Sequence, residues 1–495
     1  GIKAAVAVAL LAISAFLLKS DVWTFWTWWL LAGVMGFAAM PVTGRLFWRF
    51  EDKGWIFSKV LAIAATGFLT WFLTAIRLIP FNALTCAAVT ILCAVICFFL
   101  LRKESKEKTE CFPVDRISLI YWEELLFFLA FLMWTYLAGF RPAAYGTEKF
   151  MDYGFMEAMM RSTTLPARDL WYSEGHINYY YGGQYFAVFL TKLSHTKVEL
   201  TYNLMRTFVA GLAFAMPFSL VYQMMSDRMK GLQKSEKVIK GLPFAAGFTA
   251  GTAVSIAGNM HYVIYAQIIP LIEKLTGKEV SSYWFPDATR YIGYNPYREE
   301  DRTIHEFPCY SFVLGDLHAH VVNIMFVLLV IALLYVWLRG VRKKTVPVET
   351  SMKDGKFWKE QLLMPHLLVI SALLGMFQWT NFWDFVIYYV VTLGTVLFAN
   401  IIRFQGKIKK IIVVTFAQMA EIYLLAYLVI LPFTLQFDTM VDGIGIAKYH
   451  SYFYQLLVLW GLPAVLTITF VISMLWEKLR GMEHKSLYRL IKAIR

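Results

Sequence analysis

Residues 315–344 read Gly-Asp-Leu-His-Ala-His (315–320), then VVNIMFVLLVIALLYVWL (321–338), then Arg-Gly-Val-Arg-Lys-Lys (339–344). The middle segment carries no charge, and its length approaches the ~20 apolar residues that a helix needs to cross a ~30 Å hydrocarbon layer. Asp and His side chains precede it, and a basic cluster follows it. This stretch therefore predicts a membrane-spanning helix whose two ends differ in chemistry.

The same pattern recurs along the chain. Of its 495 residues 59% are hydrophobic and only 16% are charged, against roughly 25% charged in soluble domains. We therefore predict an all-α fold, a polytopic membrane helical bundle of about twelve spans, at approximately 2–18, 22–42, 56–76, 80–101, 118–139, 199–225, 241–269, 321–338, 362–380, 382–402, 411–434 and 452–476. The apolar stretch 184–194 is shorter and is expected to lie along the interface or to re-enter.

The net charge of +13 comes from basic clusters between the spans. Of the 47 Lys and Arg residues, 26 lie in six segments that share one side if the twelve spans are correct: 45–53, 102–108, 228–240, 339–344, 403–410 and 478 onward. Cytoplasmic loops collect basic residues in this way. We expect a multi-pass protein of the cell (plasma) membrane with both termini cytoplasmic, and no nucleic-acid partner.

The opposite face carries two long loops, 140–198 and 270–320, which are rich in Trp, Tyr, His and charged residues. Long structured loops on one face are where function tends to concentrate. We therefore expect the active site on the extracytoplasmic face. The predicted organisation is a four-span N-terminal region (1–117), a membrane domain that carries both loops (118–476) and a basic cytoplasmic tail (477–495).

Two carboxylates in the first loop, Glu148 and Asp152, are four residues apart. A helix that starts near Thr147 would place both on one face. Such a pair can hold a divalent cation, or one member can act as a general base. The alternative is a pair of charges favoured by the dipole of a helix N-terminus.

The second loop ends in Asp316-x-His318-x-His320. In an extended segment these alternating side chains would point to one side, as the ligands of a single cation must. Imidazole and carboxylate together suit Zn, Mn or Fe. The alternative is a structural or sugar-binding network of hydrogen bonds. Asp384 and His450 lie on the same face, although Asp384 is also placed to cap the next helix.

Several motifs occur in a fixed order: Tyr179-Tyr180-Tyr181, Glu306-Phe-Pro, Gly-Asp316-Leu-His318-Ala-His320, Asn-Phe-Trp-Asp384, and His450 ahead of Trp460-Gly461. Through them the chain from about 118 to 476 resembles the YYY family of multispan membrane proteins, which is similar to the GT-C glycosyltransferases. The resemblance implies a GT-C-like enzyme that moves a sugar from a polyprenyl-phosphate-linked donor to an extracytoplasmic acceptor, which is a protein, a polysaccharide or a lipid.

In GT-C enzymes an acidic residue of the first large outer loop is the base or a metal ligand. The resemblance thus implies Asp152 as first choice and Glu148 as second, although here the loop follows the fifth span instead of the first. A divalent cation (Mn, Mg or Zn) is the implied cofactor, with Asp316, His318 and His320 as its candidate ligands.

A donor phosphate needs cations, and a sugar ring or polyprenyl chain needs aromatic surface. Candidate substrate-binding residues on the outer face are Lys149, Arg161, His176, Asn178, Tyr179, Tyr180, Tyr181, Arg290, Glu306, Asp384 and His450. The basic ones are alternatively snorkelling side chains, and the tyrosines part of an interfacial belt. A lipid-linked sugar flippase and a non-catalytic scaffold for envelope assembly remain the alternative functions.

Overall fold

The computed structural model describes residues 1–107, 111–231, 236–341, 352–439 and 445–480. Within these ranges every regular element is a helix, and the only β-type pairings are two isolated bridges, Arg168 with His176 and Tyr294 with Tyr297. The predicted all-α class is therefore confirmed for this part of the chain.

The long helices are α1 (Ile2–Leu18), α2 (Val22–Leu46), α3 (Trp55–Ala75), α4 (Ala83–Glu107), α5 (Ile117–Ala138), α8 (Val198–Gly231), α9 (Glu236–Ser255), α12 (Ala319–Val341), α14 (Pro365–Thr380), α15 (Phe382–Phe404), α16 (Ile408–Val429) and α18 (Phe453–Arg480). The short ones are α6 (Lys149–Arg161), α7 (Gly182–Ser194), α10 (Ile269–Leu275), α11 (Pro308–Leu314), α13 (Gly355–Leu362) and α17 (Leu431–Thr434).

In the described ranges, nine helical stretches are long and apolar enough to cross a membrane, with α1 and α2 counted together. The pair α13 and α14, bent by 53°, would make a tenth. The chain is thus a multispan membrane protein, but the predicted count of twelve is not confirmed. The predicted span 241–269 is too long, because α9 ends at Ser255. Beyond it, Asn259 bonds the backbone at Ala288 and His261 and so competes with helix continuation.

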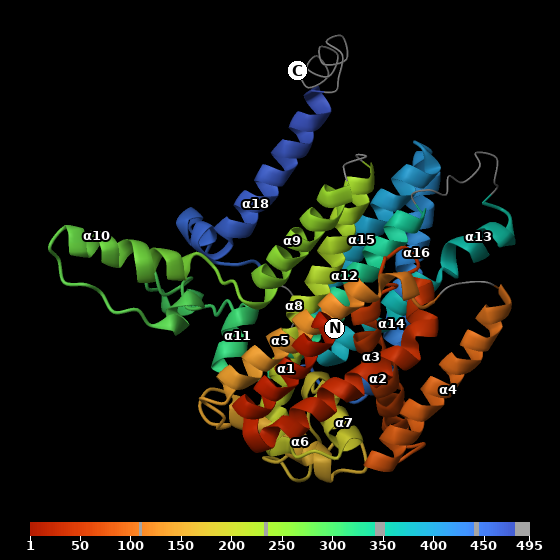
Figure 1. Ribbon diagram of the computed structural model, residues 1–495, viewed down its shortest axis with the longest axis horizontal. Coiled ribbons are helices and arrows are strands. Elements are labelled where there is room, and N and C mark those ends of the chain that lie inside the picture. Colours follow the sequence, from red (N-terminus) through yellow and green to blue (C-terminus); the bar gives the residue numbers. More distant parts are fainter. Residues whose placement is uncertain (108–110, 232–235, 342–351, 440–444, 481–495) are drawn as a thin grey trace. The chain divides into compact units, whose positions relative to one another are not determined.

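By spatial contacts the chain forms two compact units: residues 1–256 with 311–440, and residues 257–310 with 441–495. In the first unit α8 packs against α5, α9 and α12, and α14 packs against α15 and α16 (Figure 1). In the second, Tyr291 and Ile292 pack against Val458 and Leu459 of α18. The predicted boundaries at residues 117 and 476 stay predictions.

One end of the first unit gathers ion pairs from several basic segments, and we call it the basic end. Glu51, in the turn between α2 and α3, pairs with Lys230 at 2.5 Å and with Arg116 at 3.5 Å. Arg339 pairs with Asp227 at 3.1 Å. The ends of α8 and α12 therefore meet the start of α5 here.

At the other end of the first unit lie α6 and α7, beside the start of α8 (Figure 1). Every side chain of α7 from Gly182 to Lys192 is buried. Gly182 permits the close fit, because a Cβ there would lie 2.7 Å from Thr380 Cγ2 and 2.8 Å from Trp379 Cδ2. The apolar stretch 184–194 thus lies inside the bundle and not along its surface.

Candidate functional site

The first loop presents its two carboxylates on the first turn of α6. Glu148 precedes the helix, which begins at Lys149, and Asp152 follows one turn later. The side chain of Glu148 is 63% exposed, whereas that of Asp152 is 1% exposed. Both face the same imidazole: His318 Nδ1 lies 3.8 Å from Glu148 Oε2 and 3.4 Å from Asp152 Oδ2. The four-residue spacing therefore does place them on one face.

The buried helix α7 fixes the carboxylate of Asp152. Gln184 Nε2 donates to Asp152 Oδ1 at 2.8 Å and to the carbonyl of Leu317 at 3.0 Å. One amide therefore joins α6 to the segment that carries His318. Asp152 Oδ2 receives no hydrogen bond from the part of the chain that the structure describes. His318 Nδ1 lies 3.4 Å from this oxygen.

His318 stands between two carboxylates, because a tight turn at Gly315 brings Asp316 back toward α6. Gly315 has φ of +89°, a conformation that favours glycine. Asp316 accepts from the Thr147 hydroxyl at 2.6 and 2.7 Å, and its Oδ2 lies 3.6 Å from His318 Nε2. The imidazole thus has Asp316 on one side and Asp152 on the other.

Two buried cations flank the turn at Gly315. A Cβ at this position would lie 3.2 Å from Lys149 Nζ and 3.2 Å from the guanidinium carbon of Arg206. Arg206 donates to the carbonyl of Phe312 and to Asn203 Oδ1. Asp152, Asp316, Lys149 and Arg206 therefore form a cluster with equal numbers of acidic and basic side chains, which tempers the cost of burying charge.

Burial sets the protonation of this cluster. It raises the pKa of the Asp152 carboxyl, and the neighbouring His318 and Gln184 only partly oppose that shift. Burial lowers the pKa of Lys149, which Asp316 opposes. Burial, Tyr180 and the carboxylates of Asp152 and Glu148 raise the pKa of Tyr179, so this phenol stays protonated. A carboxylate with a raised pKa beside an imidazole is suited to accept a proton near neutral pH.

The ring of His320 lies beside that of His318, with centroids 5.7 Å apart. His320 is the second residue of α12, so the segment does not stay extended, and its Nε2 lies 3.4 Å from Ser311 Oγ. Within the described ranges, no group of three or more His, Cys, Asp or Glu side chains is arranged to hold a metal ion. Asp316, His318 and His320 therefore do not fit one ion as they stand. The metal site stays a prediction.

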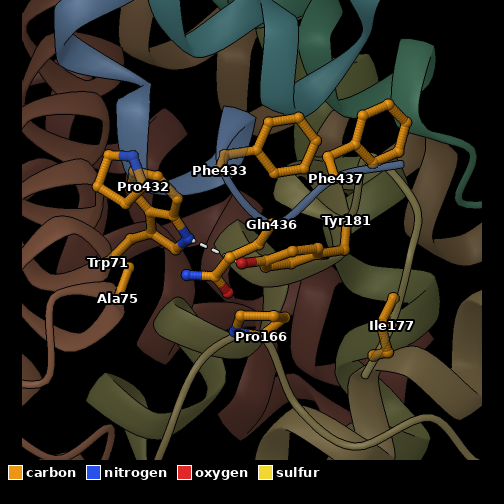
Figure 2. Close-up of a pocket in the computed structure, with 9 residues that line it drawn as sticks. All are labelled: Trp71, Ala75, Pro166, Ile177, Tyr181, Pro432, Phe433, Gln436 and Phe437. Atoms are coloured by element: carbon orange, nitrogen blue, oxygen red, sulfur yellow. Dashed lines mark hydrogen bonds between the residues drawn. The ribbon is translucent and has the colours of Figure 1, made fainter. Parts of the chain in front are cut away.

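The three tyrosines diverge. Tyr179 contacts Phe155 and Tyr180, with ring centroids 5.8 and 4.3 Å apart. Tyr181 is buried, and its hydroxyl accepts a 3.0 Å hydrogen bond from Trp71 Nε1. Figure 2 shows Tyr181 in the wall of a pocket with about 260 Å³ of empty space, lined by Trp71, Ala75, Pro166, Ile177, Tyr181, Pro432, Phe433, Gln436 and Phe437. Tyr179 is close enough to Asp152 and Glu148 for their charges to act on its phenol.

Other predicted residues of the first unit lie outside the cluster. Arg161 is exposed at the far end of α6, and His176 is exposed in the loop. Asn178 exchanges two hydrogen bonds with the backbone of Asp438. Asp384 accepts from Asn323 at 2.7 Å and from Asn381 at 2.9 Å, which links the start of α15 to α12.

Three predicted residues belong to the second unit. Arg290 donates to Pro286 O and Tyr310 Oη, and its guanidinium lies 5.5 Å from the Trp284 ring centroid. Glu306 is half-buried and His450 is exposed. Their role in substrate binding stays a prediction.

The structure adds three residues that the sequence analysis missed: Gln184, Thr147 and Arg206. Arg206 lies within the apolar span α8, and a charged residue inside a span is a recognised sign of function. Gln184 is likewise a polar residue in an apolar stretch. Both signals were available in the sequence.

One comparison with known proteins returned a match. A family model described as uncharacterized membrane protein (DUF2298) matches residues 65–494. No curated protein and no solved structure matches the chain.

Proposed function

The chain belongs to the DUF2298 family of membrane proteins, and from the site at the α6–α7 end of its bundle we propose that it is a membrane glycosyltransferase. It moves a sugar from a polyprenyl-phosphate-linked donor to an acceptor on the extracytoplasmic face, and its fold is GT-C-like. The observation that carries the proposal is the buried Asp152, held by Gln184 and facing His318 at 3.4 Å.

The Asp152–His318 pair accepts the proton of the acceptor hydroxyl. Asp152 is the buried carboxylate, and His318, 17% exposed, is nearer to solvent. As the acceptor oxygen bonds to the anomeric carbon, the bond from that carbon to the phosphate oxygen breaks. The products are the glycosylated acceptor and polyprenyl phosphate, and the proton stays on the pair.

The departing phosphate needs positive charge. Lys149 supports this step because it is the first residue of α6, three residues before Asp152, and a phosphate is stabilised both by the ammonium and by a helix N-terminus. Arg206 helps from behind the turn at Gly315, where it is held by two hydrogen bonds. The location at the end opposite the basic end supports the extracytoplasmic assignment.

The test is release of labelled sugar from a panel of polyprenyl-phosphate monosaccharides by the purified full chain. We expect Asp152→Asn and His318→Gln each to lower turnover by about 10²- to 10⁴-fold. The matched control is Glu174→Gln, an exposed carboxylate of the same loop. Loss of turnover in EDTA with recovery on adding one divalent cation would support the metal prediction.

Unchanged turnover in Asp152→Asn would contradict the assignment of the pair. A folded wild-type protein that neither binds nor turns over any donor in the panel would contradict the transferase proposal. That result would favour the flippase or the scaffold.

A further inference from the structure

At the α6–α7 end of the first unit, the ends of three helices surround a cavity that the proposed transfer reaction does not use. Its empty space is about 500 Å³, within the range of about 300–1,000 Å³ found for ligand pockets. It is lined by Asp21 and Thr24 at the start of α2, by Thr135 and its neighbours at the end of α5, and by one face of α8. The candidate residues Asp152 and His318 do not line it, so the cavity is a separate place for a ligand.

The face of α8 that lines the cavity is polar along two turns. Glu199, Asn203 and Thr207 follow one another at intervals of four residues, so they form one stripe along the helix. The dipole of a helix N-terminus favours an acid at Glu199, as it does at Asp21 before α2. The stripe continues beyond that first turn, into a span that is otherwise apolar. The wall of the cavity is therefore polar from its rim inward.

Hydrogen-bond acceptors outnumber free donors in this cavity. The amide of Asn203 donates to the carbonyl of Pro142 at 2.7 Å. Thr135 donates to the hydroxyl of Thr207 at 2.9 Å, and Thr207 donates to a backbone carbonyl of α8 at 3.1 Å. The two carboxylates, when ionised, can only accept. A ligand that fits the cavity must therefore supply donors.

The carboxylates also give the cavity a negative charge. Glu199 forms no hydrogen bond or ion pair within the described part of the chain, and Asp21 accepts a 3.4 Å hydrogen bond from Ser20. No Lys, Arg or His side chain is among the residues that line the cavity. A metal ion does not suit it, because the described ranges hold no group of three His, Cys, Asp or Glu side chains arranged around one point. A primary ammonium does, since it combines a positive charge with three N–H donors and no acceptor.

The position of the cavity indicates the source of the ammonium. α2, α5 and α8 are all candidate spans, and the cavity lies at their shared end, at the level of lipid headgroups. Trp23 and Tyr136, each next to a lining threonine, are 69% and 40% exposed, as is typical of rings at a membrane interface. Lys19 and Lys197 each precede one of the acids by two residues, are exposed and form no ion pair within the described part of the chain. A headgroup with an ammonium beside a phosphate matches these charges.

We propose that this cavity binds the headgroup of an ethanolamine phospholipid from the adjoining leaflet. The ammonium donates to the carboxylates of Asp21 and Glu199, and the phosphate lies toward Lys19 and Lys197. The acyl chains stay in the membrane. The site is separate from the proposed transfer reaction and does not depend on it.

The test is native mass spectrometry of the purified full chain in detergent, with phosphatidylethanolamine, phosphatidylcholine and phosphatidylglycerol of identical acyl chains. We expect the wild type to bind one ethanolamine lipid about 10- to 100-fold more tightly than the choline lipid, whose quaternary ammonium has no N–H donor. Glu199→Gln should lose most of this preference. Glu174→Gln, which changes an exposed carboxylate outside the cavity, should keep it. Equal binding of the ethanolamine and choline lipids, or tighter binding of phosphatidylglycerol, would overturn the proposal.

Ala138→Phe tests the cavity apart from its charges, because it adds a ring to the lining of α5 and leaves both carboxylates in place. It should also abolish the preference. A preference that persists in both Ala138→Phe and Glu199→Gln would place the lipid elsewhere on the bundle and contradict the site. If neither variant folds, the unfolding temperature of the wild type decides: the ethanolamine lipid should raise it more than the choline lipid. Equal shifts would count against the site.

Discussion

Replacing Gln184 by Leu tests whether α7 sets the pKa of Asp152, the proposed proton acceptor. The Leu side chain is of similar size but removes the 2.8 Å hydrogen bond to Asp152 Oδ1 and the 3.0 Å bond to Leu317 O. Gln184 donates to the carboxylate and so favours its charged form. Without it, the pKa of Asp152, already raised by burial, rises further.

The magnitude follows from the strength of that bond. A hydrogen bond to a charged group contributes about 1.5–3 kcal/mol, and one pKa unit corresponds to about 1.4 kcal/mol. The expected shift in the Asp152 pKa is therefore about 1–2 units upward. Since the base must be deprotonated, the acidic limb of the kcat/KM profile should move up in pH by the same amount. The alkaline plateau should be largely retained.

The assay is sugar release from the lipid-phosphate donor across a pH series, for protein whose unfolding temperature shows that it is folded. Gln223→Leu is the matched control, because Gln223 also donates to a carboxylate, Asp227 Oδ1 at 3.2 Å, but at the basic end. Its acidic limb should not move. An unmoved limb in folded Gln184→Leu protein would refute the role of α7 in setting the pKa.

Three further predictions concern packing, charge and orientation. Gly182→Ala should lower the free energy of unfolding by about 1–3 kcal/mol, because its Cβ would overlap Thr380 and Trp379. The control Gly394→Ala should not lower it, because a Cβ added there would meet no neighbouring side chain or segment within 4 Å. Equal unfolding temperatures of the two variants in detergent would contradict the buried position of α7. Lys59→Met should lower the free energy of unfolding by about 3 kcal/mol. This is the lower end of the range for breaking a buried ion pair, because Glu124 is 21% exposed. Lys448→Met, which breaks an exposed pair with Glu300, should change nothing measurable in the same unfolding assay, and a similar loss in both would argue against burial as the cause. With the five native cysteines replaced, Glu174→Cys should react with a membrane-impermeant thiol reagent on intact cells and Lys409→Cys only after permeabilisation; the reverse pattern would invert the proposed orientation.

Hydropathy and charge predicted the class of this protein because those signals are local. The run 321–338 needs no information from elsewhere in the chain to be read as a span, and α12 covers it. The ends of the helices were harder to predict. For example, α9 ends at Ser255, and the side-chain hydrogen bonds of Asn259 that follow it cannot be seen in hydropathy. The division into two units depends on contacts between distant segments, which no local pattern encodes.

The candidate site shows the same contrast. The i, i+4 spacing of Glu148 and Asp152 was sufficient to place both on one face of a short helix. Both carboxylates also face His318, which is more than 160 positions later in the chain. Local spacing could not predict this contact. The alternation of Asp316, His318 and His320 suggested three ligands on one side, but α12 begins at Ala319 and turns His320 toward Ser311.

The length of α8 has a consequence for the depth in the lipid at which the proposed transfer would take place. Its 34 residues extend about 51 Å, whereas the hydrocarbon layer is about 30 Å thick. The hydroxyl of Tyr202, one turn before Arg206 in α8, accepts a hydrogen bond from the backbone N–H of Leu317 in the cluster. If the helix is centred on the bilayer, Tyr202 lies about 19 Å and Arg206 about 13 Å from the midplane. These residues bracket the boundary between acyl chains and headgroups. The phosphate of a lipid-linked donor also lies at this boundary, so the donor could reach the cluster while its hydrocarbon chain stays in the membrane.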